Sequence, residues 1–261
     1  MPTMPRFAAL PARAGWRTVD FISDLHLKPE EPATFAAWEH YLLHTPADAV
    51  FLLGDLFEAW VGDDCATPGS FEARCGALLR AAGAAVDLLF MRGNRDFLVG
   101  REFLAQHGVQ DLADPSVLTF AGTRYVLTHG DLLCTADVAY QQFRQQVRTP
   151  EWQAAFLARP LAERQAIARQ MREQSEAQHA GQTYAPTDDA LARQWLAAGD
   201  ATELIHGHTH QPADHDLGTD AQGRRLSQHV LSDWHLADGV RRLQVLRLDA
   251  DGLVRVTPES P

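Results

Sequence analysis

Short apolar runs in this chain end in polar side chains at five places. Runs of four or five residues rich in Val, Leu, Ile or Phe predict buried strands. A strand delivers the side chains that follow it to the rim of its sheet, where open α/β folds place their active sites. The five runs and the residues that follow them are Val19–Ser23 with Asp24 and His26, Val50–Leu53 with Gly54 and Asp55, Leu88–Met91 with Gly93, Asn94, Arg95 and Asp96, Tyr125–Thr128 with His129 and Asp131, and Glu203–His206 with Gly207, His208 and His210.

Helical patterns alternate with these runs as far as about residue 131, as they do in βαβ units. Apolar residues at helical spacing predict three helices, over Thr34–His44, Phe71–Ala82 and Arg101–His107. Alternation and turn residues in the C-terminal part predict strands over Arg225–Leu231, Val240–Leu248 and Leu253–Thr257. Helix-flanked sheets of this composition predict an α/β fold, a four-layer α-β-β-α sandwich of two mixed sheets.

A segment of about residues 136–199 departs from this pattern, because it shows almost no strand signal. Tyr140, Phe143 and Val147 recur at helical spacing within it. Between Val138 and Gln182 there are six arginines and four glutamates, a net charge of +2 in a chain whose total is −11. We expect a helical insertion that projects beside the rim as a lid. The alternative is an ordinary helical hairpin that packs on the core.

Length, charge and cysteine content narrow the class of protein. The 261 residues fit an N-terminal extension over 1–16 and one domain over 17–261. The net charge of −11 argues against general nucleic-acid binding, which needs a basic face. Cys65, Cys75 and Cys134 form no CxxC pair, which is typical of a reducing compartment. Prolines interrupt the first 16 residues, and no apolar stretch approaches the about 18–20 residues of a spanning helix, so we expect a cytosolic protein whose membrane contact is peripheral.

The side chains that follow the five runs are those that bind divalent metal ions. Taken alone, an Asp or His at the end of a strand is usually a cap, a turn residue or a solvated group. Five such ends at one rim offer enough carboxylate, amide and imidazole ligands for two ions that share one carboxylate. Two ions about 3.5–4 Å apart suit phosphoryl transfer, because they hold the attacking and leaving oxygens together. The set of five therefore predicts a dinuclear metal site for this chemistry.

The ordered set resembles the calcineurin-like metallophosphoesterase superfamily over about residues 18–210. Within that superfamily the chain is similar to the family of UDP-2,3-diacylglucosamine hydrolases, the pyrophosphatases of lipid A biosynthesis in Gram-negative bacteria. The general motifs indicate the fold and the metals, whereas the segment Glu58–Asp63 and the Gly-Asn-Arg-Asp string that begins at Gly93 are much more specific to this family. The segments that carry the resemblance are Phe21–Leu27, Gly54–Asp64, Gly93–Phe97, Thr128–Thr135 and Ile205–Pro212.

The resemblance implies a role for each matching residue. Two divalent ions, expected to be Mn²⁺, would share the Asp55 carboxylate. The first ion would take Asp24, His26, Asp55 and His210, and the second Asp55, Asn94, His129 and His208. The expected catalytic residues are Asp55, Asn94, Arg95 and His129, and the expected substrate contacts are Asn94, Arg95, Asp137, Ser175, His179, Gln182 and His208. The related enzymes carry Asn and Lys where this chain has His179 and Gln182, so Arg172 is a candidate replacement for the missing cation. Asp131 is expected to steady His129, and His206 to be structural.

Arg95 distinguishes this chain from the wider superfamily, in which a His usually follows the Asn and protonates an alkoxide leaving group. A phosphate leaving group needs little protonation, and a fixed guanidinium stabilises its developing charge better than an acid does. Arg95 therefore favours cleavage of a phosphoanhydride over an alkyl phosphate. The alternative is that Arg95 forms an ion pair with Asp96 or another neighbour.

The resemblance implies hydrolysis of the diphosphate of UDP-2,3-diacylglucosamine to UMP and 2,3-diacylglucosamine 1-phosphate (lipid X). The enzyme would lie peripherally on the cytoplasmic face of the inner membrane, and the lid would hold the acyl chains. A different enzyme hypothesis is a metallophosphoesterase for a soluble nucleotide diphosphate or a dinucleoside polyphosphate. A scaffold without catalytic activity is a third, but such proteins usually lose several ligands, and all the expected ones are present here.

Overall fold

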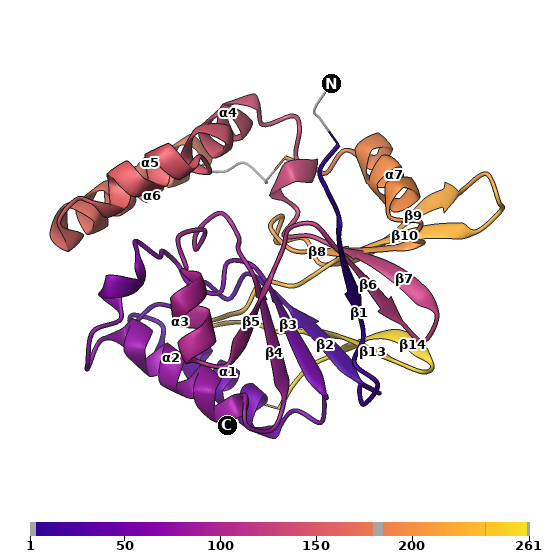
Figure 1. Ribbon diagram of the computed structural model, residues 1–261, viewed down its shortest axis with the longest axis horizontal. Helices are drawn as coiled ribbons and strands as arrows, with labels where there is room; N and C mark the ends of the chain where they lie inside the picture. The colour runs from indigo at the N-terminus through magenta and orange to yellow at the C-terminus, as the bar shows by residue number, and fades with distance from the viewer. Residues whose placement is uncertain (1–3, 180–184, 238, 260–261) are drawn as a thin grey trace.

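Two six-stranded sheets form the centre of the computed structural model (Figure 1). The structure describes residues 4–179, 185–237 and 239–259, and the side chains of 174–179 lie outside that description. In spatial order, the first sheet contains β1 (Ala8–Pro11), β6 (Ser116–Phe120), β7 (Thr123–Leu127), β8 (Glu203–His206), β10 (Arg225–Val230) and β9 (Ala213–Thr219). The second contains β14 (Gly252–Val256), β13 (Val245–Asp249), β2 (Val19–Ile22), β3 (Ala49–Leu53), β4 (Asp87–Met91) and β5 (Val109–Leu112). A separate hairpin pairs β11 (His235–Ala237) with β12 (Val240–Arg242).

Helices cover the outer face of each sheet, and this gives the expected four layers. The helices are α1 (Pro32–His44), α2 (Phe71–Ala82), α3 (Arg101–Gln106), α4 (Val138–Val147), α5 (Pro150–Leu157), α6 (Leu161–His179) and α7 (Asp189–Ala198), with short 3-10 turns η1 (Asp63–Cys65) and η2 (Asp131–Leu133). Successive residues of a strand point to opposite faces. Phe21 of β2 therefore enters the apolar cluster between the sheets, while Ile22 enters the cluster beneath α1, α2 and α3. On the other side, Trp195 of α7 packs on the first sheet. The predicted α-β-β-α architecture is confirmed.

Parallel pairing brings the ends of the predicted strands to one rim. β2, β3, β4 and β5 pair in parallel in the second sheet, and β7, β8 and β10 do so in the first. The loops that follow them bond to one another. The Asp24 N–H donates to the Gly54 carbonyl at 3.0 Å, and the Gly207 N–H donates to the His129 carbonyl at 2.9 Å. The His208 N–H reaches from one sheet to the other and donates to Asp24 Oδ2 at 2.9 Å.

The expected insertion over about 136–199 divides into two parts. In Figure 1, α4, α5 and α6 extend together beyond the strand ends, whereas α7 lies over the first sheet. We call α4, α5 and α6 the insertion helices. Trp152, Phe156 and Ile167 of these helices pack against the cluster of the second sheet. The segment thus projects beside the rim and also rests on the core.

Residues 4–16, which belong to the expected N-terminal extension, contribute a strand to the first sheet. β1 pairs in parallel with β6, with Leu10 opposite Leu118, and Trp16 packs between the sheets. Pro5, Pro11 and the shortness of β1 mask the strand signal of this segment. β5, β6 and β9 are further strands that the sequence pattern does not reveal. Within the described residues, no helix has both the length and the apolar character needed to cross a bilayer.

Candidate metal centre

Left-handed backbone conformations concentrate at the rim. Seven non-glycine residues of the described chain have a positive φ, and five of them are expected ligands. Such a conformation costs a non-glycine residue on the order of 1 kcal/mol or more, so the surrounding loops must impose it. The five are Asp24 (56°), His26 (47°), Asp55 (53°), His208 (67°) and His210 (53°). Strained backbone of this kind is characteristic of functional sites.

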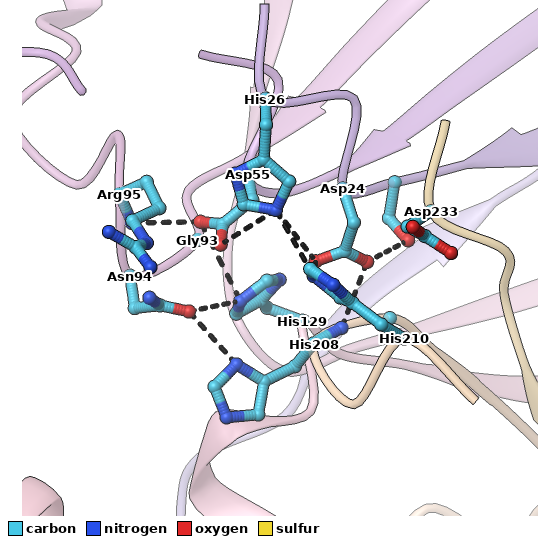
Figure 2. A network of polar contacts seen from close by, with 12 residues as sticks. Asp24, His26, Asp55, Gly93, Asn94, Arg95, His129, His208, His210 and Asp233 are labelled. Atoms are coloured by element: carbon cyan, nitrogen blue, oxygen red, sulfur yellow. Dashed lines mark hydrogen bonds and ion pairs between the residues drawn. The ribbon is translucent and has the colours of Figure 1, made fainter. Parts of the chain in front are cut away.

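A first group brings together Asp24, His26, Asp55 and His210, the set expected for the first ion (Figure 2). The Nε2 atoms of His26 and His210 lie 3.1 Å apart. Asp24 Oδ1 lies 3.4 Å from His210 Nε2 and 3.9 Å from His26 Nε2. This oxygen is buried and accepts no hydrogen bond within the described part of the chain. Imidazole nitrogens that converge on a buried carboxylate oxygen without a hydrogen bond form a cradle for a cation.

A second group contains Asn94, His129 and His208, with Asp55 beside them. Asn94 Oδ1 lies 2.9 Å from His129 Nε2 and 2.9 Å from His208 Nδ1. The other ring nitrogen of His129, Nδ1, donates to the Leu53 carbonyl at 2.9 Å. This bond fixes the tautomer and leaves the Nε2 lone pair directed at the group, as in metal-binding histidines generally. Asn94, His129 and His208 therefore meet as predicted for the second ion.

The two oxygens of Asp55 face different groups. Oδ1 lies 3.7 Å from His129 Nε2, and Oδ2 lies 3.9 Å from His26 Nε2. The Arg95 N–H donates to Oδ1 at 2.8 Å and so fixes the carboxylate. Only a glycine fits at position 93, since a Cβ there would lie 2.1 Å from Oδ1. This placement suits a carboxylate that donates one oxygen to each of two ions.

The electrostatics of the centre favour added positive charge. Burial alone would lower the pKa of His129, yet the carboxylates of Asp55, Asp24 and Asp131 raise this pKa to about 9. A site that raises the pKa of a buried imidazole in this way also stabilises a bound cation. Mixed carboxylate, amide and imidazole donors suit first-row divalent metals. The residues present therefore fit two divalent ions.

Glu58 connects the first group to two arginines. Its Oε2 lies 3.3 Å from His26 Nδ1. Its Oε1 lies 3.8 Å from Arg95 Nη1 and 3.5 Å from Arg172 Nη1, which reaches over from α6. Both guanidinium groups are thereby held beside the metal ligands, and the Arg95 ion pair is with Glu58. The sequence reveals Glu58 only as part of a family-specific segment and gives it no role.

Asp131 does not hold His129 in the expected way. Its Oδ2 accepts hydrogen bonds from the Tyr140 hydroxyl and from Arg144 Nε, both at 2.6 Å, whereas the His129 ring bonds to a backbone carbonyl. Asp131 thus connects the rim to α4. His206 fits its expected structural role, since it is buried and its Nδ1 donates to the Gly207 carbonyl at 2.8 Å.

The remaining expected substrate contacts lie on or near the insertion helices. Asp137 is the N-cap of α4, and its side chain accepts the Tyr140 N–H at 3.0 Å. Ser175 and His179 fall in the last turns of α6, where the side chains lie outside the described residues. Gln182 also lies outside them. Their contacts with substrate stay predictions.

Comparison with known proteins identifies the family. The profile of the family "Calcineurin-like phosphoesterase" matches residues 17–212. A UDP-2,3-diacylglucosamine hydrolase of Chromobacterium violaceum is 46% identical over 250 residues, covering 92% of this chain and 98% of the relative. One from Xanthomonas oryzae pv. oryzae is 43% identical over 247 residues, covering 90% and 97%. A solved archaeal phosphodiesterase overlays with a TM-score of 0.46 at 12% identity, covering 92% of this chain and 98% of that chain. By its sequence relatives, the chain belongs to the calcineurin-like phosphoesterases and, within them, to the family of UDP-2,3-diacylglucosamine hydrolases.

Proposed function

We propose that this protein hydrolyses the diphosphate of UDP-2,3-diacylglucosamine to UMP and 2,3-diacylglucosamine 1-phosphate, with two Mn²⁺ ions as cofactors. Water attacks the phosphorus nearest uridine. The observation that carries the proposal is the position of Arg95, a permanent cation held beside two groups of metal-binding side chains. This combination suits a phosphate leaving group, and it occurs in a chain that is 43% and 46% identical to two relatives named for that substrate.

The chain's own residues orient and stabilise the reacting groups. Bound divalent ions supply a water of lowered pKa and stabilise negative charge on the phosphate. Asp55 and Asn94 set the spacing of the two groups, and the His129 tautomer is fixed by the Leu53 carbonyl. Arg95 faces the same space and stabilises charge on the phosphate oxygens as the bond to the leaving group breaks. Fixed donors of this kind need no reorganisation during the reaction.

The insertion helices bind the rest of the substrate. Arg172 lies within 3.5 Å of Glu58 and so stands close to Arg95, where it replaces the cation that relatives carry at position 182. The acyl chains lie against the apolar side chains of these helices, and the sugar and nucleotide reach Asp137, Ser175, His179, Gln182 and His208. A substrate with two acyl chains resides in a membrane. The enzyme therefore works peripherally, on the cytoplasmic face of the inner membrane.

The test is turnover of UDP-2,3-diacylglucosamine by metal-stripped protein to which Mn²⁺, Fe²⁺ or Zn²⁺ is returned. We expect activity to be highest with Mn²⁺. In ¹⁸O-labelled water, the label should enter UMP, because attack occurs at the phosphorus nearest uridine. Label in the sugar phosphate would contradict the direction of attack. Faster turnover of a dinucleoside polyphosphate than of the lipid substrate would favour the soluble-nucleotide alternative.

A further inference from the structure

One face of α4 points at the rim. Tyr140, Arg144 and Arg148 follow one another at intervals of four residues and therefore share one side of the helix. Each of them contacts a loop that carries a ligand of the second group. The rest of α4 is largely exposed, and only Val147 of this helix is buried. Polar contacts to the rim thus account for much of what holds α4 in place.

Arg148 fixes the loop that carries Asn94. Its Nη2 donates to the Gly93 carbonyl at 2.8 Å, directly before Asn94 in the chain. Its guanidinium also lies over the Phe97 ring, with 5.0 Å between Cζ and the ring centroid. Arg148 therefore contacts this loop on both sides of Asn94, and both contacts fix the position of its backbone.

Arg144 and Tyr140 fix the loop that carries His129. Both donate to the same oxygen of Asp131, at 2.6 Å, and Asp131 lies two residues after His129 in η2. Asp131 has no exposed surface, so its charge depends on these partners. The Tyr140 ring also lies 5.8 Å from the ring of His208, at 32°. One helix thus reaches all three of the residues that complete the second group.

The first group is supported in a different way. Its His26 is contacted by Glu58, which follows β3, and His208 N–H and Ser23 Oγ donate to Asp24 Oδ2 at 2.9 Å and 2.5 Å. These partners come from the sheet-end loops themselves. The direct partners of the two groups therefore come from different parts of the molecule, although the groups share Asp55 and although Arg172 of α6 contacts the first group indirectly, through Glu58.

We propose that Tyr140, Arg144 and Arg148 are positioning residues for the second ion, so that docking of α4 and completion of the second metal group are one event. The inference rests on the proposed dinuclear function and deepens it. With α4 in place, Asn94, His129 and His208 are held at their observed separations. When a contact from α4 is lost, the second ion binds more weakly while the first is unaffected.

The experiment measures Mn²⁺ binding to metal-stripped protein by calorimetry, without substrate. Arg148→Ala and Tyr140→Phe should raise the Kd of one of the two ions about 10–100-fold, the usual effect of removing a residue that supports a metal ligand. The same changes made in a His208→Ala background, where the second group is already incomplete, should leave the Kd of the remaining ion unchanged. Arg148→Lys should restore part of the affinity, since a lysine also donates to a carbonyl. Arg159→Ala, an exposed change on the same insertion, is the matched control.

The metal-binding results test the role of α4, and the hydrolysis of the lipid substrate tests the proposed function. Wild-type Kd values in both variants would overturn it, and so would a Kd change of equal size in the His208→Ala background. A wild-type protein that binds a single ion would overturn it as well. Failure of the wild type to hydrolyse UDP-2,3-diacylglucosamine would instead refute the proposed substrate and leave this metal-binding comparison intact.

Discussion

The rim and the insertion helices differ in how deeply they are buried and in the contacts that hold them. At the rim, Asp24, Asp55 and His129 are each at most 2% exposed, and neighbouring loops bond to one another through the backbone. Over their described residues the insertion helices are mostly exposed, and they attach through a few arginines and a small apolar patch that includes Trp152, Phe156 and Ile167. Within that patch the rings of Trp152 and Phe156 stack, with their centroids 4.8 Å apart. The rim is thus held by burial and by bonds between its loops, whereas the insertion depends on a small number of contacts.

This difference suits the two regions to different tasks in the enzyme. Phosphoryl transfer requires ligand atoms to be held within fractions of an ångström, which buried loops on a sheet provide. Recognition of a flexible lipid requires an apolar surface that adapts, and we propose that the insertion helices, which are anchored by few contacts, provide it. Damage to the rim should therefore abolish the reaction, while damage to the insertion should weaken binding or stability.

The largest effect is expected at Asp55. Asp55→Ala should reduce activity more than about 10³-fold, because it removes a carboxylate from both ligand groups. It also removes the acceptor of the Arg95 backbone N–H. It should also lower metal content more than His26→Ala, which touches one group. Metal analysis of both purified variants measures this. Equal metal loss in the two, or full occupancy in Asp55→Ala, contradicts a bridging carboxylate.

Substitution of Arg95 tests whether the metal-binding side chains stabilise the leaving phosphate without a permanent cation beside them. Arg95→His replaces a permanent cation by one that titrates, and activity on the lipid substrate should fall about 10²–10³-fold. Metal content should stay at the wild-type level, because the side chain of Arg95 is not an expected ligand. Steady-state kinetics decide the point, with Arg159→Ala as the control. Near wild-type turnover in Arg95→His would make Arg95 structural.

Substitution of Arg164 tests whether this side chain anchors the insertion helices to the rest of the protein. Its side chain is buried, pairs with Asp64, and donates to the carbonyls of Val61 and Arg159. Arg164→Ala leaves a buried carbonyl without its donor, and the free energy of unfolding should fall by about 1–3 kcal/mol. Arg159→Ala removes only the exposed pair with Glu163 and should cost about 0–1 kcal/mol. Denaturant unfolding compares the two, and equal losses would mean that Arg164 is not an anchor.

The smallest effect concerns pH and His229, a residue of β10 that is neither an expected ligand nor part of the insertion helices. Burial lowers the pKa of His229, but its hydrogen bonds to Glu203 and Asp214, at 2.8 Å and 2.7 Å, raise it overall. A raised pKa in the folded state contributes stability that is present at pH values below about 6.5 and is lost as the pH rises through the folded pKa. Arg255 also pairs with Asp214, so the effect should stay within about 1 kcal/mol. Unfolding of wild type and His229→Gln between pH 6 and about 9 measures it, and a constant difference across that range contradicts it.

The rim was predictable from sequence because its ligands follow apolar strands directly. All seven expected ligands lie in one centre, since parallel pairing brings the ends of β2, β3 and β4 together and β7 and β8 face them. Local sequence indicates which residues reach the rim, and the resemblance to the family implies how they divide between the two ions. The two-sheet architecture follows from the same alternation of strands and helices.

Other features were hidden because they depend on residues that are distant in the chain. Glu58 has a role only where His26, Arg95 and Arg172 converge on it. β9 (Ala213–Thr219) lies at a sheet edge with mostly exposed residues, so it lacks an apolar pattern. The sequence indicates helices within 136–199, yet only packing separates α7, on the first sheet, from the insertion helices.

The measurement that tests this division most directly is kcat/KM for UDP-2,3-diacylglucosamine against UDP-N-acetylglucosamine, in wild type and in Phe143→Ala. Phe143 lies half-buried on α4 and is not an expected metal ligand. Each buried methylene contributes about 0.8 kcal/mol, so the wild type should prefer the lipid substrate by several orders of magnitude. Phe143→Ala should reduce that preference and leave metal content unchanged. Equal kcat/KM for both substrates in the wild type would show that the insertion recognises no lipid and would contradict the account.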